Sequence, residues 1–283
     1  MADDTAPPAG VFDFSHAGLL LVAHGSPSTP GGRTSTRKHA ETIGNLNLFA
    51  DVQAGFLTEK PFVKNVLDEM RTQEVYVVPN LACAGYITTT KLPAALNLTG
   101  PVTERITPNG HQRVILTDPV GTDPALPRTL ATRIKAAMDG LKVSRDDCAV
   151  VVIGHGSQKS RESFEHTNRV ATDMGRQNLG MEIVTTFLEE APLIKDWGDL
   201  TDAKTVIFAP FLISDGYHGA DEIPRAIGFD VKDTAFQDKL TKVQPNEISM
   251  NGRHLVYLPP IGDAPEMAEL VLTRVRAAQA TAV

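Results

Sequence analysis

The chain alternates short apolar runs with longer polar or amphipathic stretches. In the first half the apolar runs cover residues 18–23, 52–57, 74–78 and 113–117. Helical patterns lie between or after them, at residues 35–46, 61–71, 93–96 and 124–141. Strands that alternate with helices indicate parallel strands joined by helical crossovers. We therefore predict an α/β fold in which this half forms a four-stranded parallel sheet flanked by helices.

The second half repeats the first. His24-Gly-Ser recurs 131 residues later as His155-Gly-Ser, and the same offset pairs Phe56 with Phe187, Pro61 with Pro192, Pro79 with Pro210, Gly85 with Gly216 and Pro93 with Pro224. After an insertion of ten residues within 229–254 the offset becomes 141, which pairs Pro119 with Pro260, Pro124 with Pro265 and Arg133 with Arg274. A long period with two copies indicates a duplicated domain rather than a solenoid. We expect a loose tail at residues 1–17, a first repeat at 18–143 and a second at 144–283.

Composition narrows the class of protein. With 283 residues, 42% of them hydrophobic, the chain can bury a sizeable core. Its net charge of −7 gives no general attraction to nucleic acid, and its two cysteines look like buried thiols rather than a disulfide framework. No apolar run approaches the roughly 20 residues of a membrane span, and the acidic first residues do not resemble a secretory signal. We expect a cytoplasmic protein that binds neither nucleic acid nor membrane, as a monomer or weak homo-oligomer.

Candidate chemistry follows three apolar runs of the second half. His155 follows residues 148–154, Glu189 and Glu190 follow residues 183–188, and His218 follows residues 205–212. Parallel strands bring their carboxyl ends to one edge of a sheet, where open α/β folds bind ligands. Two imidazoles and a carboxylate suit a divalent metal such as Co²⁺, Ni²⁺, Fe²⁺ or Zn²⁺. Asp221 and Glu222, just after His218, are candidates to orient its ring.

Each of these features also has an ordinary structural interpretation. A histidine in a strand-end turn is more often hydrogen-bonded than metal-bound, and two adjacent glutamates are usually solvated. The Gly-His-Gly-Ser run could cradle a phosphate, but it lacks the spacing of dinucleotide-binding and Walker motifs, and it is not a nucleophile elbow. In the first repeat Ile87 stands where His218 stands and Thr58 where Glu189 stands. We therefore predict one site, in the second repeat.

Taken together, the motifs resemble a known family. An apolar strand that ends in His-Gly-Ser, Phe-Leu-Glu before a proline, Gly-Tyr-His followed by Asp-Glu-Ile-Pro, and a late Pro-Ile-Gly turn are similar to the class II tetrapyrrole chelatases. These are the sirohydrochlorin cobalt- and ferrochelatases of the CbiX and SirB type. The resemblance covers about residues 18–274 and implies two similar α/β halves with the active cleft between them.

The resemblance also implies an activity: insertion of a divalent metal into a sirohydrochlorin-like tetrapyrrole of cobalamin- or siroheme-type biosynthesis. The metal (Co²⁺, Fe²⁺ or Ni²⁺) is a substrate, and no organic cofactor is expected. His155 and His218 would hold the metal and remove pyrrole protons, with help from Glu190 or Glu189; the motif does not decide between these two. Candidates to bind the macrocycle are Ser157, Tyr217, His24, Lys159 and Arg161, although the last two also fit an ordinary solvated helix face.

The sequence departs from the family pattern in two ways, which leaves other functions possible. Many long two-domain CbiX-type proteins carry their histidine pair in the first half, whereas here it lies in the second. The insertion within residues 229–254 is also unusual. A tetrapyrrole or metal carrier without turnover, or a phosphate-handling enzyme on the same scaffold, is therefore an alternative.

Overall fold

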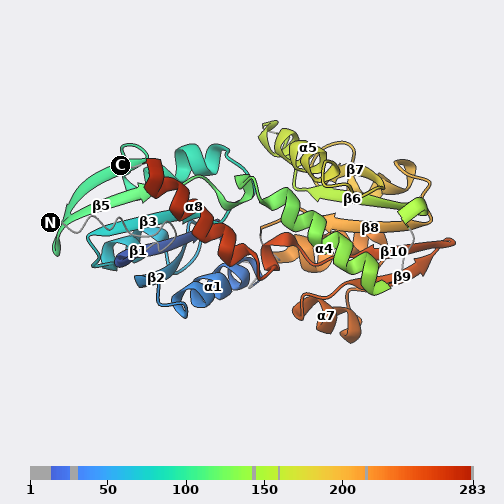
Figure 1. Cartoon of the computed structure of the whole chain (residues 1–283), viewed down its shortest axis with the longest axis horizontal. Helices are drawn as coiled ribbons and strands as arrows, with labels where there is room; N and C mark the ends of the chain where they lie inside the picture. The colour runs from blue at the N-terminus through green and yellow to red at the C-terminus, as the bar shows by residue number, and fades with distance from the viewer. Residues whose placement is uncertain (1–13, 26–30, 142–144, 159, 214–215, 282–283) are drawn as a thin grey trace, which may run out of the picture.

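The protein consists of two α/β halves with the same topology (Figure 1). The structure is a computed structural model that describes residues 14–25, 31–141, 145–158, 160–213 and 216–281. The first sheet contains β1 (Phe14–Ala23), β2 (Phe49–Phe56), β3 (Glu74–Pro79), β4 (Val102–Thr107) and β5 (Gly110–Leu116) in the order β2-β1-β3-β5-β4. The second contains β6 (Cys148–Gly154), β7 (Glu182–Phe187), β8 (Thr205–Pro210), β9 (Asn246–Met250) and β10 (Arg253–Tyr257) in the matching order β7-β6-β8-β10-β9.

Each sheet has five strands rather than the four that we predicted. The additional strands, β4 and β9, are antiparallel to β5 and β10 and form an outer edge. In the second half the hairpin turns at Asn251-Gly252, whose φ angles are +53° and +74°, and Asn-Gly is a favoured pair for tight hairpin turns. The prediction of a loose tail as far as residue 17 is also wrong at its end, because β1 begins at Phe14, which stacks on Phe49 of β2. Residues 1–13 of that tail lie outside the described residues.

Eight α-helices and six short helical turns occur within the described residues. The α-helices are α1 (Gly31–Gly44), α2 (Val63–Glu69), α3 (Leu92–Leu96), α4 (Leu126–Leu141), α5 (Glu162–Gly175), α6 (Ile223–Ile227), α7 (Thr234–Thr241) and α8 (Met267–Thr281). The 3-10 turns are η2 (Val120–Thr122), η3 (Arg145–Asp147), η4 (Ile194–Asp199) and η6 (Ile261–Asp263), and the π-helical turns are η1 (Ile87–Lys91) and η5 (His218–Glu222). α7 lies within the insertion of the second repeat. None of the helices described has the length and apolar character that crossing a membrane requires.

Alternation along the strands places apolar side chains on both faces of each sheet. In β1, Leu19 and Leu21 face one cluster of buried residues, whereas Leu20 and Val22 face another. α2 and α3 supply the cover over Leu20 and Val22, and η4, α6 and α7 cover the corresponding face of the second sheet. The remaining two faces share one continuous core that runs through both halves.

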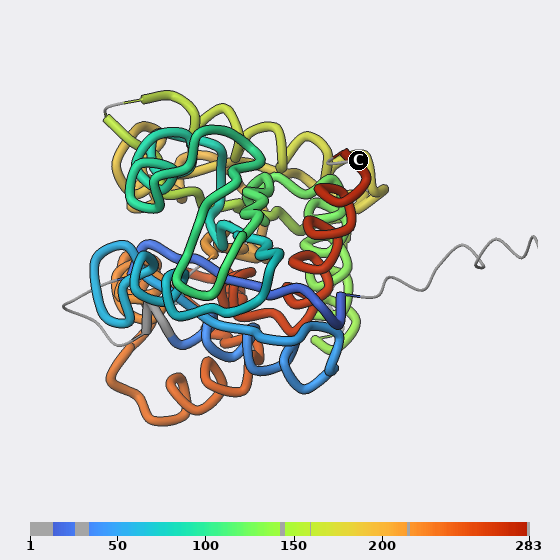
Figure 2. Tube along the Cα trace, turned by 90° about the vertical axis from the view of Figure 1, so that its left-hand side faces the viewer, coloured from blue at the N-terminus to red at the C-terminus, as the bar shows by residue number. Residues whose placement is uncertain are grey.

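The halves exchange their last helices. α4 ends the first repeat but packs on α5 and β8 of the second half, and α8 ends the second repeat but packs on α1, β3 and η2 of the first half. Figure 1 shows the crossing, with α8 (red) over the first sheet and α4 (green) over the second, and Figure 2 shows both helices on the same side of the molecule. The duplicated sequence units at residues 18–143 and 144–283 therefore differ from the structural halves, since each half borrows a helix from the other.

Two arginines of the repeat stabilise this exchange. Arg133 on α4 donates to the carbonyl oxygen of Pro260 in the second half, at 3.4 Å. Arg274 on α8, which is 8% exposed, lies 3.1 Å from the carboxylate of Asp123 in the first half. Asp123 is itself buried, so the two charges compensate each other away from water. The recurrence of arginine at these positions thus reflects how each exchanged helix is held to the opposite half.

Candidate metal and tetrapyrrole site

Loops at the carboxyl edges of the two sheets contact each other. His166 on α5 bonds to the carbonyl oxygen of Gly121 at 2.9 Å, and His39 on α1 bonds to that of Gly262 at 2.7 Å. Burial lowers the pKa of both imidazoles, which are therefore neutral donors near pH 7. Nearby, burial and then the charge of Glu162 raise the pKa of the Cys83 thiol. The edge that carries the predicted site of the second half thus faces the corresponding edge of the first.

His155 lies on a tight turn at the end of β6. All seven residues of β6 are buried, and the strand ends at Gly154. Gly156 has a φ of +74°, a conformation that disfavours side chains, so the chain can reverse directly after the histidine. The Nδ1 atom of His155 lies 2.9 Å from the carbonyl oxygen of Gly156. A carbonyl only accepts, so Nδ1 carries the proton and Nε2 presents its lone pair.

His218 begins the π-helical turn η5, which follows β8. Its Nδ1 atom lies 2.5 Å from Oε2 of Glu222, four residues later in the same turn. Both side chains are roughly two-fifths exposed, at 43% and 42%. The carboxylate accepts from Nδ1–H, and in the neutral form of the ring Nε2 is then the atom with a lone pair. Glu222 therefore orients the ring as expected from the sequence, whereas Asp221 pairs with Arg225.

The two imidazoles meet, as the sequence predicted. Their ring centroids are 5.0 Å apart and the ring planes are at 89° to each other. Within the described residues, no hydrogen bond engages the Nε2 atom of either ring. Neutral imidazoles with one nitrogen fixed by an oxygen acceptor are the usual form in which histidine binds a metal. The pair can therefore bind a borderline divalent cation.

The two predicted carboxylates do not join the imidazoles in a ready-made cluster. Oε1 of Glu190 accepts from the backbone N–H of Ser157 at 2.9 Å, and its Cγ packs beneath Gly156. Glu59, the equivalent of Glu190, packs beneath Gly25 in the same way. Glu189 is exposed. In the part of the chain that the structure describes, no three His, Cys, Asp or Glu side chains are arranged to hold a metal ion.

The described members of the predicted macrocycle-binding set follow strands β1, β6 and β8, at the carboxyl edges of the two sheets. Tyr217 is 51% exposed, with its ring centroid 6.0 Å from that of His218. His24 occupies the turn equivalent to that of His155, with Nδ1 3.0 Å from the Gly25 carbonyl oxygen. The guanidinium of Arg161 lies 4.2 Å from the centre of the Phe164 ring. Lys159 lies outside the described residues.

One buried polar group near the site was missed by sequence reasoning. The hydroxyl of Tyr257, at the end of β10, donates to the carbonyl oxygen of Gly219 at 2.7 Å. Gly219 directly follows His218. Comparison of the two repeats could have drawn attention to Tyr257, because the equivalent residue in the first half is Leu116, which has no hydroxyl.

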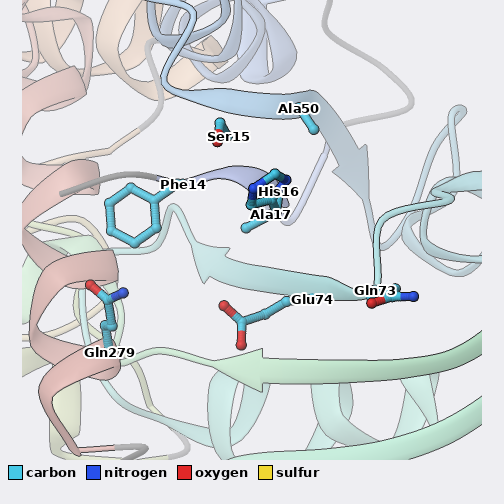
Figure 3. A pocket seen from close by; sticks show the side chains of 8 residues that line it. All are labelled: Phe14, Ser15, His16, Ala17, Ala50, Gln73, Glu74 and Gln279. Atoms are coloured by element: carbon cyan, nitrogen blue, oxygen red, sulfur yellow. The ribbon is translucent and has the colours of Figure 1, made fainter.

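Surface hollows occur on both edges of the sheets. One of about 780 Å³ is lined by Gln158, Leu188, Glu189, Glu190, Ala191 and Leu193, beside the turn that carries His155. Another, of about 550 Å³, lies at the amino ends of β1 and β3, where His16 and Glu74 line it together with Gln279 of α8 (Figure 3). The second hollow is at the opposite end of the strands from the histidine turns. The hollow at the carboxyl edge is therefore the one that belongs to the candidate site.

Comparison with known proteins finds relatives that span both repeats. The CbiX family matches residues 18–137 and again 149–278, so it covers both repeats. A protein of Halobacterium salinarum named as a probable sirohydrochlorin cobaltochelatase is 27% identical over 269 residues, which are 90% of this chain and 89% of that protein.

Solved structures show the same fold. CbiX, described as the terminal enzyme for siroheme biosynthesis in denitrifying bacteria, aligns with a TM-score of 0.66 and 24% identity over 92% of this chain and 99% of its own. SirB of Bacillus subtilis, solved with Fe³⁺, aligns with a TM-score of 0.65 and 20% identity over 94% and 96%. A multi-domain chelatase-like protein of Deinococcus radiodurans aligns with a TM-score of 0.67 and 23% identity over 92% of this chain, which spans only 54% of that longer protein.

Proposed function

The chain belongs to the CbiX family, and on that premise we propose that it is a metal chelatase that inserts a divalent metal ion into a sirohydrochlorin-type tetrapyrrole. Co²⁺ and Fe²⁺ are the proposed metals, with Ni²⁺ as a further candidate, and the product would enter cobalamin- or siroheme-type biosynthesis. The name of the halobacterial relative supports the substrate class and Co²⁺, and the SirB structure with Fe³⁺ supports an iron species as ligand of this fold.

The observation that carries the proposal is the meeting of His155 and His218 with both Nδ1 atoms occupied. The two rings would hold the incoming metal through the lone pairs of their Nε2 atoms. Each ring is held by an acceptor of its own, the Gly156 carbonyl for His155 and the Glu222 carboxylate for His218. Such outer partners fix the tautomer and orientation of a metal-binding imidazole.

The same two Nε2 atoms can also accept the two protons that metal insertion releases. Insertion of a divalent ion releases two protons from the pyrrole nitrogens of the macrocycle. As the metal leaves each Nε2 for the pyrrole nitrogens, that Nε2 lone pair becomes available and accepts one proton. Both rings are then imidazolium ions, and the charge on His218 is compensated by Glu222, which already binds its Nδ1–H. Loss of these protons to water returns the site to its starting state.

We propose that a carboxylate assists the two histidines. The positions of Glu190 and Glu189 suit them to different roles. Glu190 braces the turn that presents His155, through its bond to the Ser157 N–H. Glu189 is exposed and lines the hollow beside that turn, which suits delivery of the metal or removal of protons. Substitution of each by glutamine separates the two: Glu190→Gln should lower protein stability as well as activity, whereas Glu189→Gln should lower activity alone.

We propose that the macrocycle binds beside the histidine pair. Tyr217 offers an exposed aromatic ring next to His218 on which a tetrapyrrole can stack. Arg161 and Lys159 follow the His155 turn in the sequence and carry charges complementary to the substrate's carboxylates. Ser157 and His24 complete the proposed contacts, the first from the turn of His155 and the second from the equivalent turn of the other half.

The test is an insertion assay followed by absorbance, with sirohydrochlorin and Co²⁺, Fe²⁺ or Ni²⁺. The variants are His155→Ala and His218→Ala, and the matched control is His111→Ala, which removes an exposed imidazole from the outer hairpin. Turnover that is lost in the first two and retained in the control supports the proposal. Binding of the tetrapyrrole without turnover in the unmodified protein would support a carrier instead, and full activity in His218→Ala would overturn the assigned site.

A further inference from the structure

The π-helical turn that begins at His218 leaves one of its carbonyl groups without a backbone donor. The N–H of Ile223 bonds to the carbonyl oxygen of His218, in the i to i+5 pattern of a π-helix. The next bond in this pattern would join residue 224 to the carbonyl of Gly219. Residue 224 is a proline and has no N–H. The buried carbonyl of Gly219 therefore needs a donor from elsewhere.

Tyr257 supplies that donor. Its hydroxyl lies 2.7 Å from the Gly219 carbonyl oxygen, and its side chain is fully buried between β10 and the turn. Burial raises the pKa of the hydroxyl well above its ordinary value, so the group stays protonated and can donate. The rings of Phe229 and Phe236 pack against Tyr257 and hold it in place.

We propose that Tyr257 is a positioning residue for His218: its hydroxyl replaces the hydrogen bond that Pro224 cannot make and fixes the direction of the Gly219 carbonyl. The peptide directly after His218 is thereby held in place, so that His218 and Glu222 face each other. The inference rests on the proposed role of His218 as a ligand of the incoming metal. Without the hydroxyl, the Gly219 carbonyl must turn toward another donor. That rotation moves the peptide directly after His218 and loosens its contact with Glu222.

The first half separates the winding of the turn from the positioning of the histidine, because it forms the same π-helical turn without a tyrosine hydroxyl and without a histidine. η1 (Ile87–Lys91) also precedes a proline, Pro93, in the position of Pro224. There Ile87 replaces the histidine, and Leu116 replaces Tyr257. The histidine and the tyrosine hydroxyl thus occur together in one half and are both absent at the equivalent positions of the other.

The test compares Tyr257→Phe with Tyr76→Phe by Co²⁺ titration, followed through the visible absorption of the bound ion. Tyr76 is an equally buried tyrosine in β3 of the first half, so its variant controls for the loss of a buried hydroxyl. We expect Tyr257→Phe to weaken Co²⁺ binding roughly fivefold, the factor that corresponds to one ordinary hydrogen bond, and to alter the absorption of the bound ion. The KM for the tetrapyrrole should stay unchanged, and Tyr76→Phe should leave Co²⁺ binding unaffected.

A second substitution makes the result specific to the proposed bond. Pro224→Ala introduces an N–H at the position from which a π-helix would donate to Gly219, so it should restore most of the Co²⁺ affinity when combined with Tyr257→Phe. If Tyr257→Phe does not fold, the double variant is expected to fold, for the same reason. Failure of the double variant to regain either folding or affinity would overturn the inference.

The outcome also separates this inference from the proposed function. If His218→Ala abolishes Co²⁺ binding while Tyr257→Phe leaves both affinity and absorption unchanged, Tyr257 is only a core residue and the chelatase proposal stands. If His218→Ala leaves Co²⁺ binding intact, the proposed site is wrong, and the positioning role falls with it.

Discussion

The orientation of His218 depends on a carboxylate one helical turn away. Glu222 accepts from its Nδ1–H at 2.5 Å, while the neighbouring Asp221 is engaged by Arg225. Two adjacent acidic residues therefore have different tasks, although the sequence presents them as equivalent candidates. The choice follows from the π-helical turn, which places residues 218 and 222 on the same side.

Glu222→Gln should weaken metal binding by about 10–100-fold, the usual effect of removing an outer partner of a ligand histidine. A neutral amide holds the ring less firmly and does not compensate an imidazolium charge. The measurement is a Co²⁺ titration of the purified variant. Asp221→Asn is the matched control and should bind Co²⁺ like the unmodified protein; equal losses in both variants would contradict the assignment.

At the residue scale, the sequence predicted that the two imidazoles meet, but not that the carboxylates of Glu189 and Glu190 are used elsewhere. His155 and His218 each follow an apolar run, so a parallel sheet had to bring them to one edge. The task of Glu190 was not predictable, because it depends on the reversal of the chain at Gly156, which brings the Ser157 N–H to the carboxylate. The role of the Tyr257 hydroxyl was not predictable either, because Tyr257 lies in an apolar strand and its partner, the Gly219 carbonyl, is 38 residues away in the sequence.

At the scale of elements, the Pro-x-Gly turns after β5 and β10 are pressed against the loops that follow β3 and β8. A Cβ atom at Gly262 would lie 2.2 Å from the carbonyl carbon of Ile213, and one at Gly121 would lie 2.1 Å from the carbonyl oxygen of Ala82. Backbone approaches of this kind admit only glycine. In the second half Ile213 precedes His218 by five residues in the chain, so this turn packs against the segment just before the site.

Gly262→Ala and Gly121→Ala should therefore have equal effects on stability and different effects on function. Overpacking of this kind costs about 1–3 kcal/mol, which urea unfolding would measure for both variants. Only Gly262→Ala displaces Ile213, which precedes His218 in the chain, so only it should also weaken Co²⁺ binding. A loss of Co²⁺ affinity in Gly121→Ala of the same size would show that the effect is global.

The outer hairpins show where the prediction of elements failed. Residues 102–107 alternate only weakly between buried and exposed positions, and the segment is short and polar, so it did not stand out as a strand. The Asn251-Gly252 pair between β9 and β10 was the stronger signal, because Asn-Gly favours a two-residue hairpin turn. The central parallel strands β1, β3, β6 and β8 were predicted correctly because burial on both faces makes them almost continuously apolar.

At the scale of the whole molecule, the exchange of α4 and α8 could not be predicted from sequence. Both helices carry an apolar stripe that fits either sheet, and the two sheets have the same topology. The choice of partner is made by the direction in which the chain leaves each Pro-x-Gly turn and by contacts such as Arg274 with Asp123. These arise only in three dimensions.

Arg274→Met should destabilise the protein by about 3–5 kcal/mol, because it leaves the buried carboxylate of Asp123 without its partner. Urea unfolding would show this loss as a single transition, since each half needs the helix of the other. Arg176→Met breaks an exposed pair with Asp173 and should cost at most about 1 kcal/mol. Two separate transitions in Arg274→Met would contradict the coupling of the halves.

The contacts between the halves should also make stability depend on pH. Burial lowers the pKa of His39 and His166 in the folded protein below the unfolded value of about 6.5. As the pH falls below 6.5, the unfolded chain therefore takes up protons that the folded chain refuses, and stability decreases until the folded pKa is reached. Melting temperatures at pH 7.5 and 5.5 would measure this loss. Replacing both histidines by glutamine should reduce it, and an unchanged loss would show that other groups are responsible.

The exchanged helices have a consequence for how substrate is admitted. A hinge between two lobes needs a seam at which few contacts cross, yet here the shared core and two whole helices cross it. Separating the halves would mean peeling α4 and α8 from their sheets, which is unfolding rather than opening. The spacing of the facing edges is therefore set when the chain folds. The loops at those edges therefore have to move if a large flat ring is to enter. Variants that stiffen these loops should slow exchange of the ring more than variants at the boundary between the halves.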